Sequence, residues 1–401
     1  MSARDTVWAG HDAQWRDCAQ VASHWEEASA VEPSALRMRE RGKFWETLDR
    51  LKATLLVTRE YEHLVVALTV TGGAPSATYM RIPHPSGLVY DRERRVVHLA
   101  STRNPNQIFE LRPVTGLLRR ADVERRNHTG HHRGALVPVS TRFYPGSTYL
   151  HDLSLVGGKL HANAVGENAV VRVNISGNGS LRRVFWPRCI ERAGRAQFDR
   201  NYIQLNSIAA GATIRQSFFS ASADAITARR PGHRDFPVDG RGVIFSGATR
   251  EPVARGLTRP HSARLHRRKL WVANSGYGEI GTIVDERFEC VAALAGWTRG
   301  LTFAKGIAFA ATSRVIPRFH RYAPGLDVDK SRCAVHAIDA RTGQRLGSLT
   351  WPDGNQIFAI DWAPRNVVSG FPFSARARGD GARAKQLFYA FQTGQTGQPG
   401  D

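Results

Sequence analysis

The feature that most constrains the fold is a unit of short strands and tight turns that recurs along most of the chain. In residues 257–284, an alternation of apolar and polar residues follows Pro260, a basic turn stands at Arg267-Arg268, and a second strand covers 270–273. Residues 149–173 repeat this pattern around a glycine pair. Short strands joined by such turns are typical of antiparallel sheets.

Counting these units gives the architecture. Each begins with a polar residue where its first strand starts, and these openings lie near residues 84, 151, 206, 261, 299 and 355. Recurring units of roughly 40–60 residues, each with several strands, indicate a β-propeller. We therefore predict an all-β fold, a β-propeller over residues 51–374. Six blades are expected, and seven is the alternative.

The two ends of the chain depart from the repeat. Residues 1–50 place aromatic and aliphatic side chains at helical spacing, which predicts a short N-terminal helical segment of two amphipathic helices. Residues 375–401 are rich in glycine, glutamine and arginine and are predicted to form a loose tail, in which 387–391 could be a strand that closes a blade. The strands expected at 55–68 either complete the last blade or start another one.

The charge and the cysteines bear on partners and location. Lys and Arg total 56 and Asp and Glu total 35, which gives a formal net charge of +21. The arginine pairs are scattered and do not alternate with aromatic residues, so we expect a solvated basic surface rather than a nucleic-acid platform. No cysteine pair has the spacing of a zinc site, and no apolar run approaches the roughly 18 residues of a membrane span. The expectation is a cytoplasmic protein without a membrane segment.

A basic stretch at residues 112–134 has no apolar period and is predicted to be a long loop. It contains His128, His131 and His132, which could bind a metal ion. Histidines in an arginine-rich loop are more often solvated, and that is the interpretation we favour.

The residues that open the units are expected to meet. In a propeller the first strand of each blade lines the central channel, so the residues that enter these strands face one mouth of it. The predicted set combines imidazoles, amides and one guanidinium: His84 or Ser86, His151, Asn206, His261, Arg299, and Asn355 or Gln356.

The three imidazoles make a metal the first hypothesis. Neutral imidazole nitrogens bind zinc, copper or iron, and three of them leave a coordination position open. The predicted metal ligands are His151, His261 and His84, and the carboxylate of Asp152 is expected to orient His151. The alternative is that these histidines form hydrogen bonds across the channel and hold the blades in place.

The other polar residues suggest contacts with a substrate. A guanidinium can clamp a carboxylate or phosphate with two hydrogen bonds, and a carboxylate can act as a general base, so Arg299 and Glu279 are the candidate catalytic residues. The candidate ligand-binding residues are amides and a hydroxyl near the ends of strands: Asn206, Ser262, Asn163 and Asn274.

The same motifs carry a family resemblance. They are His151-Asp152-Leu153, Leu205-Asn206-Ser207, Pro260-His261-Ser262 with Arg264, Leu270-Trp271, Ser275-Gly276, Gly278-Glu279 and Arg299-Gly300-Leu301. Over roughly residues 52–362 the sequence resembles a bacterial family of propeller proteins described as a domain of unknown function (DUF4915). The family usually has histidine at the position of Gln204 and aspartate at that of Asn274. The resemblance implies the propeller fold and adds no established activity.

Two classes of function follow from these residues. The first is a metal-dependent lyase, hydrolase or oxidative enzyme that acts on a small molecule or a peptide end at the channel mouth. The second is a non-catalytic binding or scaffold propeller for a protein or an anionic partner. Stoichiometric zinc, copper or iron in the purified protein would favour the first class, and metal-free protein would favour the second.

Overall fold

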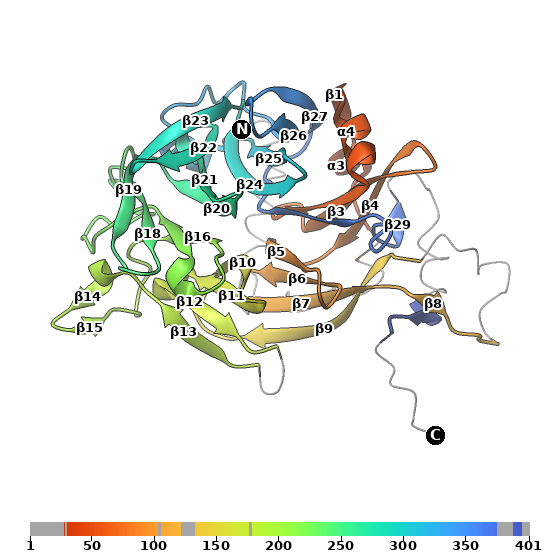
Figure 1. The fold of residues 1–401 in the computed structure, drawn as a ribbon, viewed down its shortest axis with the longest axis horizontal. Coiled ribbons are helices and arrows are strands. Elements are labelled where there is room, and N and C mark those ends of the chain that lie inside the picture. The colour runs from red at the N-terminus through yellow and green to blue at the C-terminus, as the bar shows by residue number, and fades with distance from the viewer. Residues whose placement is uncertain are drawn as a thin grey trace.

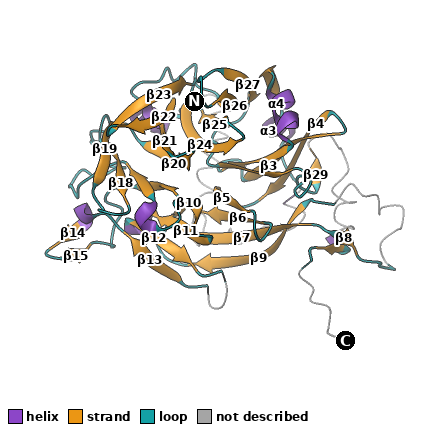
Figure 2. Cartoon of the chain, in the orientation of Figure 1, coloured by secondary structure: helices purple, strands orange, loops and turns teal. Residues whose placement is uncertain are grey.

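The chain folds into six antiparallel sheets arranged around a central axis, as the computed structural model shows (Figure 1). The structure describes residues 28, 30–102, 106–121, 133–175, 179–374 and 388–394. Strands dominate this part of the chain, and its helices are few and short (Figure 2). The predicted all-β propeller is confirmed, with six blades rather than seven.

Five blades take their four inner strands in chain order, from the axis outward. The first three are β5 (Pro85–Asp91), β6 (Val96–Ser101), β7 (Asn106–Pro113) and β9 (Leu136–Tyr144); β10 (Leu150–Val156), β11 (Lys159–Ala164), β12 (Ala169–Val173) and β13 (Leu181–Phe185); and β16 (Leu205–Ala209), β17 (Phe218–Ala221), β18 (Gly242–Ser246) and β19 (Pro252–Leu257). The next two are β20 (Pro260–His266), β21 (Lys269–Asn274), β22 (Glu279–Val284) and β23 (Arg287–Ala293); and β24 (Trp297–Ala304), β25 (Ile307–Ser313), β26 (Cys333–Asp339) and β27 (Arg345–Trp351). A separate two-stranded sheet pairs β14 (Glu191–Arg192) with β15 (Arg195–Ala196). The short 3-10 helices in the described ranges are η3 (Val165–Glu167), η4 (Arg188–Ile190), η5 (Ile214–Gln216), η6 (Ser275–Tyr277) and η7 (Pro317–Tyr322).

The sixth blade closes the ring by joining segments far apart in the sequence. Its innermost strand is β28 (Ile360–Pro364), which pairs with β2 (Ala53–Arg59). Further outward lie β3 (Leu64–Thr71), β4 (Ala74–Arg81) and β29 (Phe373–Ser374). The strands expected at 55–68 therefore complete the last blade. Such closure removes the open sheet edge that an incomplete ring would expose.

The N-terminal segment contains a strand that helical spacing did not predict. Its described residues form α3 (Pro33–Leu36) and α4 (Phe44–Leu51), but between them β1 (Arg39–Gly42) pairs with the outer edge of β27. An open edge offers unpaired backbone groups, and an extended segment can satisfy them. The rest of the predicted helical region lies outside the described residues.

The described part of the tail, residues 388–394, does not close a blade. β30 (Phe391–Gln392) pairs with β8 (Gly116–Leu117) outside the six blades, so the closing strand is β28 and not 387–391. His128, His131 and His132 lie outside the described residues. None of the helices in the described ranges is long and apolar enough to span a bilayer.

The apolar core lies between neighbouring blades, because each sheet is covered on both faces. All residues of β2 are buried, for example. The largest apolar cluster joins three adjacent blades through side chains such as Leu56, Leu99 and Phe309. Burying a side chain of this size stabilises a fold by roughly 1.5–3 kcal/mol. Apolar packing between blades is therefore the main force that holds the ring.

The inner strands share one distortion at their starts, and it positions the site. In β5, β10, β16, β20 and β24, the pairing with the neighbouring strand is interrupted within the first residues. The residue before four of these strands has a left-handed backbone: His84 (φ 41°), Tyr149 (φ 47°), Gln204 (φ 51°) and Arg259 (φ 54°). Such φ values are uncommon outside glycine, and bulges re-aim the side chains around them. This repeated geometry brings residues from several blades to one mouth of the channel.

Candidate functional site

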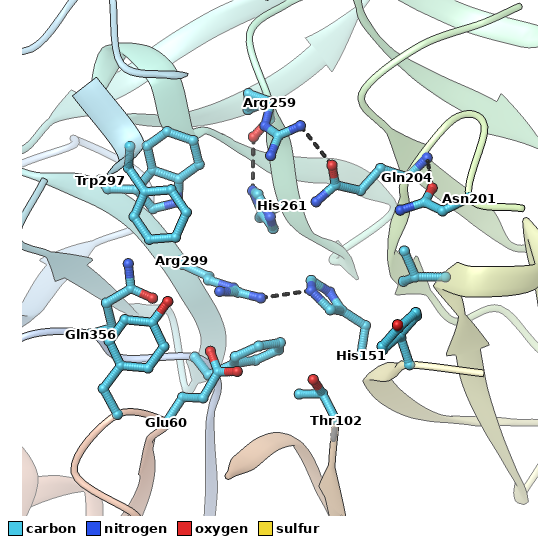
Figure 3. A pocket seen from close by; sticks show the side chains of 15 residues that line it. Glu60, Thr102, His151, Asn201, Gln204, Arg259, His261, Trp297, Arg299 and Gln356 are labelled. Atoms are coloured by element: carbon cyan, nitrogen blue, oxygen red, sulfur yellow. Dashed lines mark hydrogen bonds between the residues drawn. The ribbon is translucent and has the colours of Figure 1, made fainter. Parts of the chain in front are cut away.

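A cavity of about 260 Å³ lies at the channel mouth, where the inner strands begin (Figure 3). Its lining combines charged, amide and aromatic side chains from several blades. The ionisable groups are Glu60, Tyr61, Tyr149, His151, Arg259, His261 and Arg299. Of the residues predicted to open the units, His151, His261, Arg299 and Gln356 line this cavity, whereas His84, Ser86, Asn206 and Asn355 do not.

His151 and Arg299 form the centre of the site. His151 is the second residue of β10 and Arg299 the third of β24, and Arg299 Nη2 lies 2.8 Å from His151 Nε2 (Figure 3). An arginine can only donate, so Nε2 accepts and the imidazole is neutral. Its proton is then on Nδ1, which donates to the carbonyl oxygen of Asn206 at 3.2 Å. His151 therefore holds the Arg299 guanidinium in place through one defined tautomer.

His261 is a second neutral imidazole in this cavity. Its Nδ1 donates to the carbonyl oxygen of Arg259 at 2.8 Å and lies 3.0 Å from Ser275 Oγ, which itself donates to a backbone carbonyl. Burial, together with the positive charge of Arg299, holds the pKa of His261 well below its ordinary value. With the proton on Nδ1, Nε2 carries a lone pair that can accept a hydrogen bond or a proton.

Arg259 is the second guanidinium of the site, and it is buried. Its Nη1 donates to Gln204 Oε1 at 2.6 Å, and the guanidinium lies 4.2 Å from the ring of Tyr322. Burial lowers the pKa of Arg259 to about 10, and burial likewise lowers the pKa of Arg299 to about 10. Among the described residues, neither guanidinium forms an ion pair with a carboxylate. The cavity therefore holds two positive charges without a paired counter-ion.

Aromatic rings form the walls of the cavity. The guanidinium of Arg299 lies 3.3 Å from the ring centroid of Phe358, and the His151 ring lies 4.6 Å from the same ring. Trp297 contacts the His261 ring at 5.8 Å and stacks on Phe319 at 6.3 Å. Contacts of a cation with a ring face stabilise the pair by roughly 0.5–2 kcal/mol. The walls therefore orient the cations and also offer apolar surface to a guest molecule.

Two residues predicted to bind a ligand connect neighbouring blades instead. Asn206 Nδ2 donates to the carbonyl oxygen of Pro260 at 3.0 Å and to Ser222 Oγ at 3.2 Å. Ser262 Oγ accepts from the backbone N–H of Gly300 at 2.8 Å. The contacts with Pro260 and with Gly300 link one inner strand to the next, whereas Ser222 belongs to the same blade as Asn206. Asn206 Oδ1 is buried without a hydrogen-bond partner among the described residues, and neither Asn206 nor Ser262 lines the cavity.

Asp152 has a different partner from the one expected. It was predicted to orient His151, but its carboxylate forms a two-point ion pair with Arg264 at 2.7 and 3.0 Å and accepts from the backbone N–H of Ile208 at 3.1 Å. The bulge in β10 separates the two neighbours, so that His151 faces the cavity while Asp152 reaches the next blades.

Three other predicted residues lie away from the cavity. Asn274 Oδ1 accepts from the backbone N–H of Thr258 at 2.7 Å, and its Nδ2 donates to Glu279 Oε2 at 2.9 Å. This pair anchors the segment that leads into Arg259, and Glu279 is not within the cavity lining where a base would have to act. Asn163 is fully buried in β11, and both polar atoms of its amide lack a hydrogen-bond partner in the structure.

The predicted three-histidine group is not assembled. The His151 and His261 rings lie 6.1 Å apart, but His84 packs against His63 at 4.3 Å. The reason is that Ser86, and not His84, is the second residue of β5, so His84 precedes the strand. Over the described ranges, no group of three or more His, Cys, Asp or Glu side chains could hold a metal ion.

The lining residues that sequence reasoning missed include Arg259, Gln204, Trp297 and Phe358. Three of them share an offset that could have revealed them. Gln204, Arg259 and Trp297 each stand two residues before a predicted opening residue, as Tyr149 also does. Phe358 stands two residues after Gln356, and no comparable signal marks it.

The fold resembles solved structures at low sequence identity. The crystal structure of a nidogen/laminin complex is 11% identical, covers 78% of this chain and 98% of that chain, and has a TM-score of 0.51. A gluconolactonase from Xanthomonas campestris is 12% identical, covers 75% of this chain and 86% of that chain, and has a TM-score of 0.41. Dihydro-heme d1 dehydrogenase NirN is 11% identical, with coverages of 86% and 82% and a TM-score of 0.39. At this identity the likeness concerns the fold and not the activity.

The comparison of sequences places the chain in a family. No curated protein matches it. A family profile does match over residues 42–369, a range that begins at the end of β1 and contains all six blades except β29, together with every cavity residue named above. The chain therefore belongs to the family described as a domain of unknown function, DUF4915.

Proposed function

We propose that the channel mouth binds a small molecule that carries a carboxylate or phosphate group beside a planar or apolar part. One observation carries this proposal. Two guanidinium groups, Arg259 and Arg299, line the same cavity, and neither has a carboxylate ion-pair partner among the described residues.

An unpaired cation in such a place is unfavourable. Moving a charged group out of water costs roughly several kcal/mol unless a counter-ion accompanies it. The cost is visible in the lowered pKa of both arginines. The positive charge of Arg299 also lowers the pKa of Arg259, whereas the charges of Glu60 and Asp152 partly offset the effect of burial on Arg299. A bound carboxylate or phosphate would accept hydrogen bonds from both groups and would neutralise them.

The size and the walls of the cavity restrict the rest of the ligand. A volume of about 260 Å³ is below the roughly 300–1,000 Å³ of most drug-sized sites. Trp297, Phe319 and Phe358 present rings on which a planar or apolar group can pack. Small aromatic or cyclic anions therefore fit better than long peptides.

Proton transfer on the bound ligand is the second candidate function, and His261 favours it. Its Nδ1–H is fixed by the Arg259 carbonyl, which leaves Nε2 as the acceptor. A bound anion would offset the positive charges that lower the pKa of His261 and would make it a stronger base. A base beside an anion clamp suits a lyase or a hydrolase.

Calorimetric titration of benzoate and phenyl phosphate tests the binding proposal, and phenol serves as the neutral probe. We expect an anion to bind and phenol not to bind. Arg259→Gln and Arg299→Gln should each weaken binding about tenfold or more, because a charge-assisted hydrogen bond contributes roughly 1.5–3 kcal/mol. Arg192→Gln, which removes an exposed arginine, is the matched control. Equal binding by wild type and both cavity variants would contradict the proposal.

A further inference from the structure

A second cavity, larger than the first, lies beside the outer strands of the blade formed by β24–β27 and β1. Its volume is about 510 Å³. It shares no lining residue with the channel mouth. Five of its lining residues are arginines and one is acidic: Arg39, Arg41, Arg314, Arg332, Arg345 and Asp329.

The strand register explains why a hollow forms at this blade. Ala334 pairs with Thr350, which pairs with Arg39 on β1; one step along, His336 pairs with Ser348, which pairs with Arg41. Directly paired residues share a face of the sheet. The middle of this face therefore carries the small side chains of Ala334, Ser348 and Thr350 beside His336, while long cationic ones stand at its edge. The product is a concave surface with a positive rim.

Four of the five cavity arginines have no acidic partner among the described residues. Arg39, Arg41, Arg332 and Arg345 form no ion pair with any carboxylate in the described part of the chain. Arg332 Nη1 donates only to the backbone carbonyls of Asp329 and Ser331, at 2.8 and 2.9 Å. A neighbouring arginine outside the cavity does pair, since Arg37 contacts Asp353 at 2.9 Å. The unpaired positive charge is therefore concentrated at the cavity.

His336 gives an independent indication of a polar guest. It lines the cavity, is only 5% exposed, and its Nε2 lies 3.1 Å from Thr312 Oγ1. Its other ring nitrogen, Nδ1, is buried without a hydrogen-bond partner. Buried polar atoms nearly always have a partner, so an unsatisfied one in a cavity lining needs an explanation.

We propose that this cavity binds a small molecule with two or more phosphate groups. Guanidinium groups bind phosphate oxygens with two parallel hydrogen bonds, and several arginines against one aspartate match a multiply charged anion. A nucleic-acid strand is a poorer match, because it would require exposed aromatic platforms for its bases. The one aromatic residue of the lining, Trp351, is buried and faces the Arg59 guanidinium.

Calorimetric titration of tripolyphosphate into the full-length chain at about 150 mM salt tests this proposal, because surface attraction is largely screened there. The informative variant is Arg39→Gln/Arg41→Gln, which changes two exposed side chains on an edge strand. We expect wild type to bind and the double variant to bind at least about 100-fold more weakly, as two charge-assisted contacts are lost. The control Arg287→Gln/Arg341→Gln removes the same charge from exposed positions outside the cavity and should retain wild-type affinity.

Two further arms separate the alternatives. Arg259→Gln, altered only at the channel mouth, should retain tripolyphosphate binding at this cavity, so failure at the second cavity is distinguishable from failure of the proposal for the mouth. A single-stranded oligonucleotide should bind more weakly than tripolyphosphate. An equal loss of affinity in the control double variant, or tighter binding of the oligonucleotide, would overturn the proposal. A folded double variant with unchanged affinity would overturn it as well.

Discussion

Buried imidazoles should make this protein sensitive to acid. Burial lowers the pKa of His336 to about 3, and burial also lowers the pKa of His261 well below its usual range. In the unfolded chain both should titrate near their ordinary value of about 6.5. The unfolded state therefore takes up protons first as the pH falls. The stability that these groups contribute is present above pH 6.5 and is lost progressively below it.

The variant His336→Gln isolates this effect at one residue. A single such group changes the free energy of unfolding by about 2 kcal/mol between pH 7 and pH 5, from the linkage of about 1.4 kcal/mol per pH unit below 6.5. Urea unfolding of wild type and variant at both pH values should show a smaller loss in the variant by that amount. The exposed His233→Gln should behave like wild type. Parallel pH profiles for wild type and His336→Gln would contradict the assignment.

Single residues also show where sequence reasoning reaches and where it ends. His151, His261 and Arg299 could be expected to meet, because each opens a repeated unit and rotation about an axis superposes such positions. Arg259 and Gln204 were not predicted, because a left-handed backbone before a strand leaves no mark in an apolar pattern; only their shared offset of two residues before an opening residue could have marked them. The roles of all these residues in binding or catalysis remain predictions.

At the scale of elements, hydrogen bonds between inner strands complement the apolar packing of the blades. Asp152 on β10 contacts β16 and β20 through Ile208 and Arg264. Asp361 on β28 accepts from Thr302 on β24 and from the backbone N–H of Tyr90 on β5. Such contacts fix the angular positions of the strands whose first residues form the mouth.

Substitution Asp152→Ala tests this role. It would leave the Arg264 guanidinium without its carboxylate partner in a largely enclosed place, where breaking an ion pair costs roughly 3–5 kcal/mol. We expect a loss of about 3 kcal/mol in the free energy of unfolding, measured with urea. Asp224→Ala, which breaks the exposed pair with Arg255, should cost less than about 1 kcal/mol. A cost for Asp152→Ala no larger than that of the control would show that the link is dispensable.

Elements were predictable where the pattern was local. The two-strand units could be read from alternation and glycine turns, and so could the blade count. The strand β1 and the pairing of β30 with β8 could not be predicted. Each depends on which strand edge elsewhere in the chain is open, and not on the sequence of the segment that pairs with it. The bulges in the inner strands could not be predicted from the local pattern either. They matter because the bulge in β10 lets His151 face the cavity while Asp152 contacts the next blades.

At the scale of the whole molecule, closure of the ring by β28 brings the starts of several inner strands together in one site. The mouth draws side chains from β10, β20 and β24 and from the segment before β28, which are far apart in sequence. The propeller therefore could be predicted from the repeat, and with it the existence of a mouth. The positive charge of the mouth could not be predicted, because it depends on which arginines lack a carboxylate partner once the chain has folded.

The central claim is that Arg259 and Arg299 together hold the anionic group of a small ligand. A crystal structure of the full-length chain with phenyl phosphate tests it most directly. We expect phosphate oxygens within about 2.7–3.2 Å of guanidinium nitrogens of both arginines, with the ring against Trp297 or Phe358. A phosphate bound elsewhere, or both guanidiniums paired with carboxylates of the protein, would contradict the account.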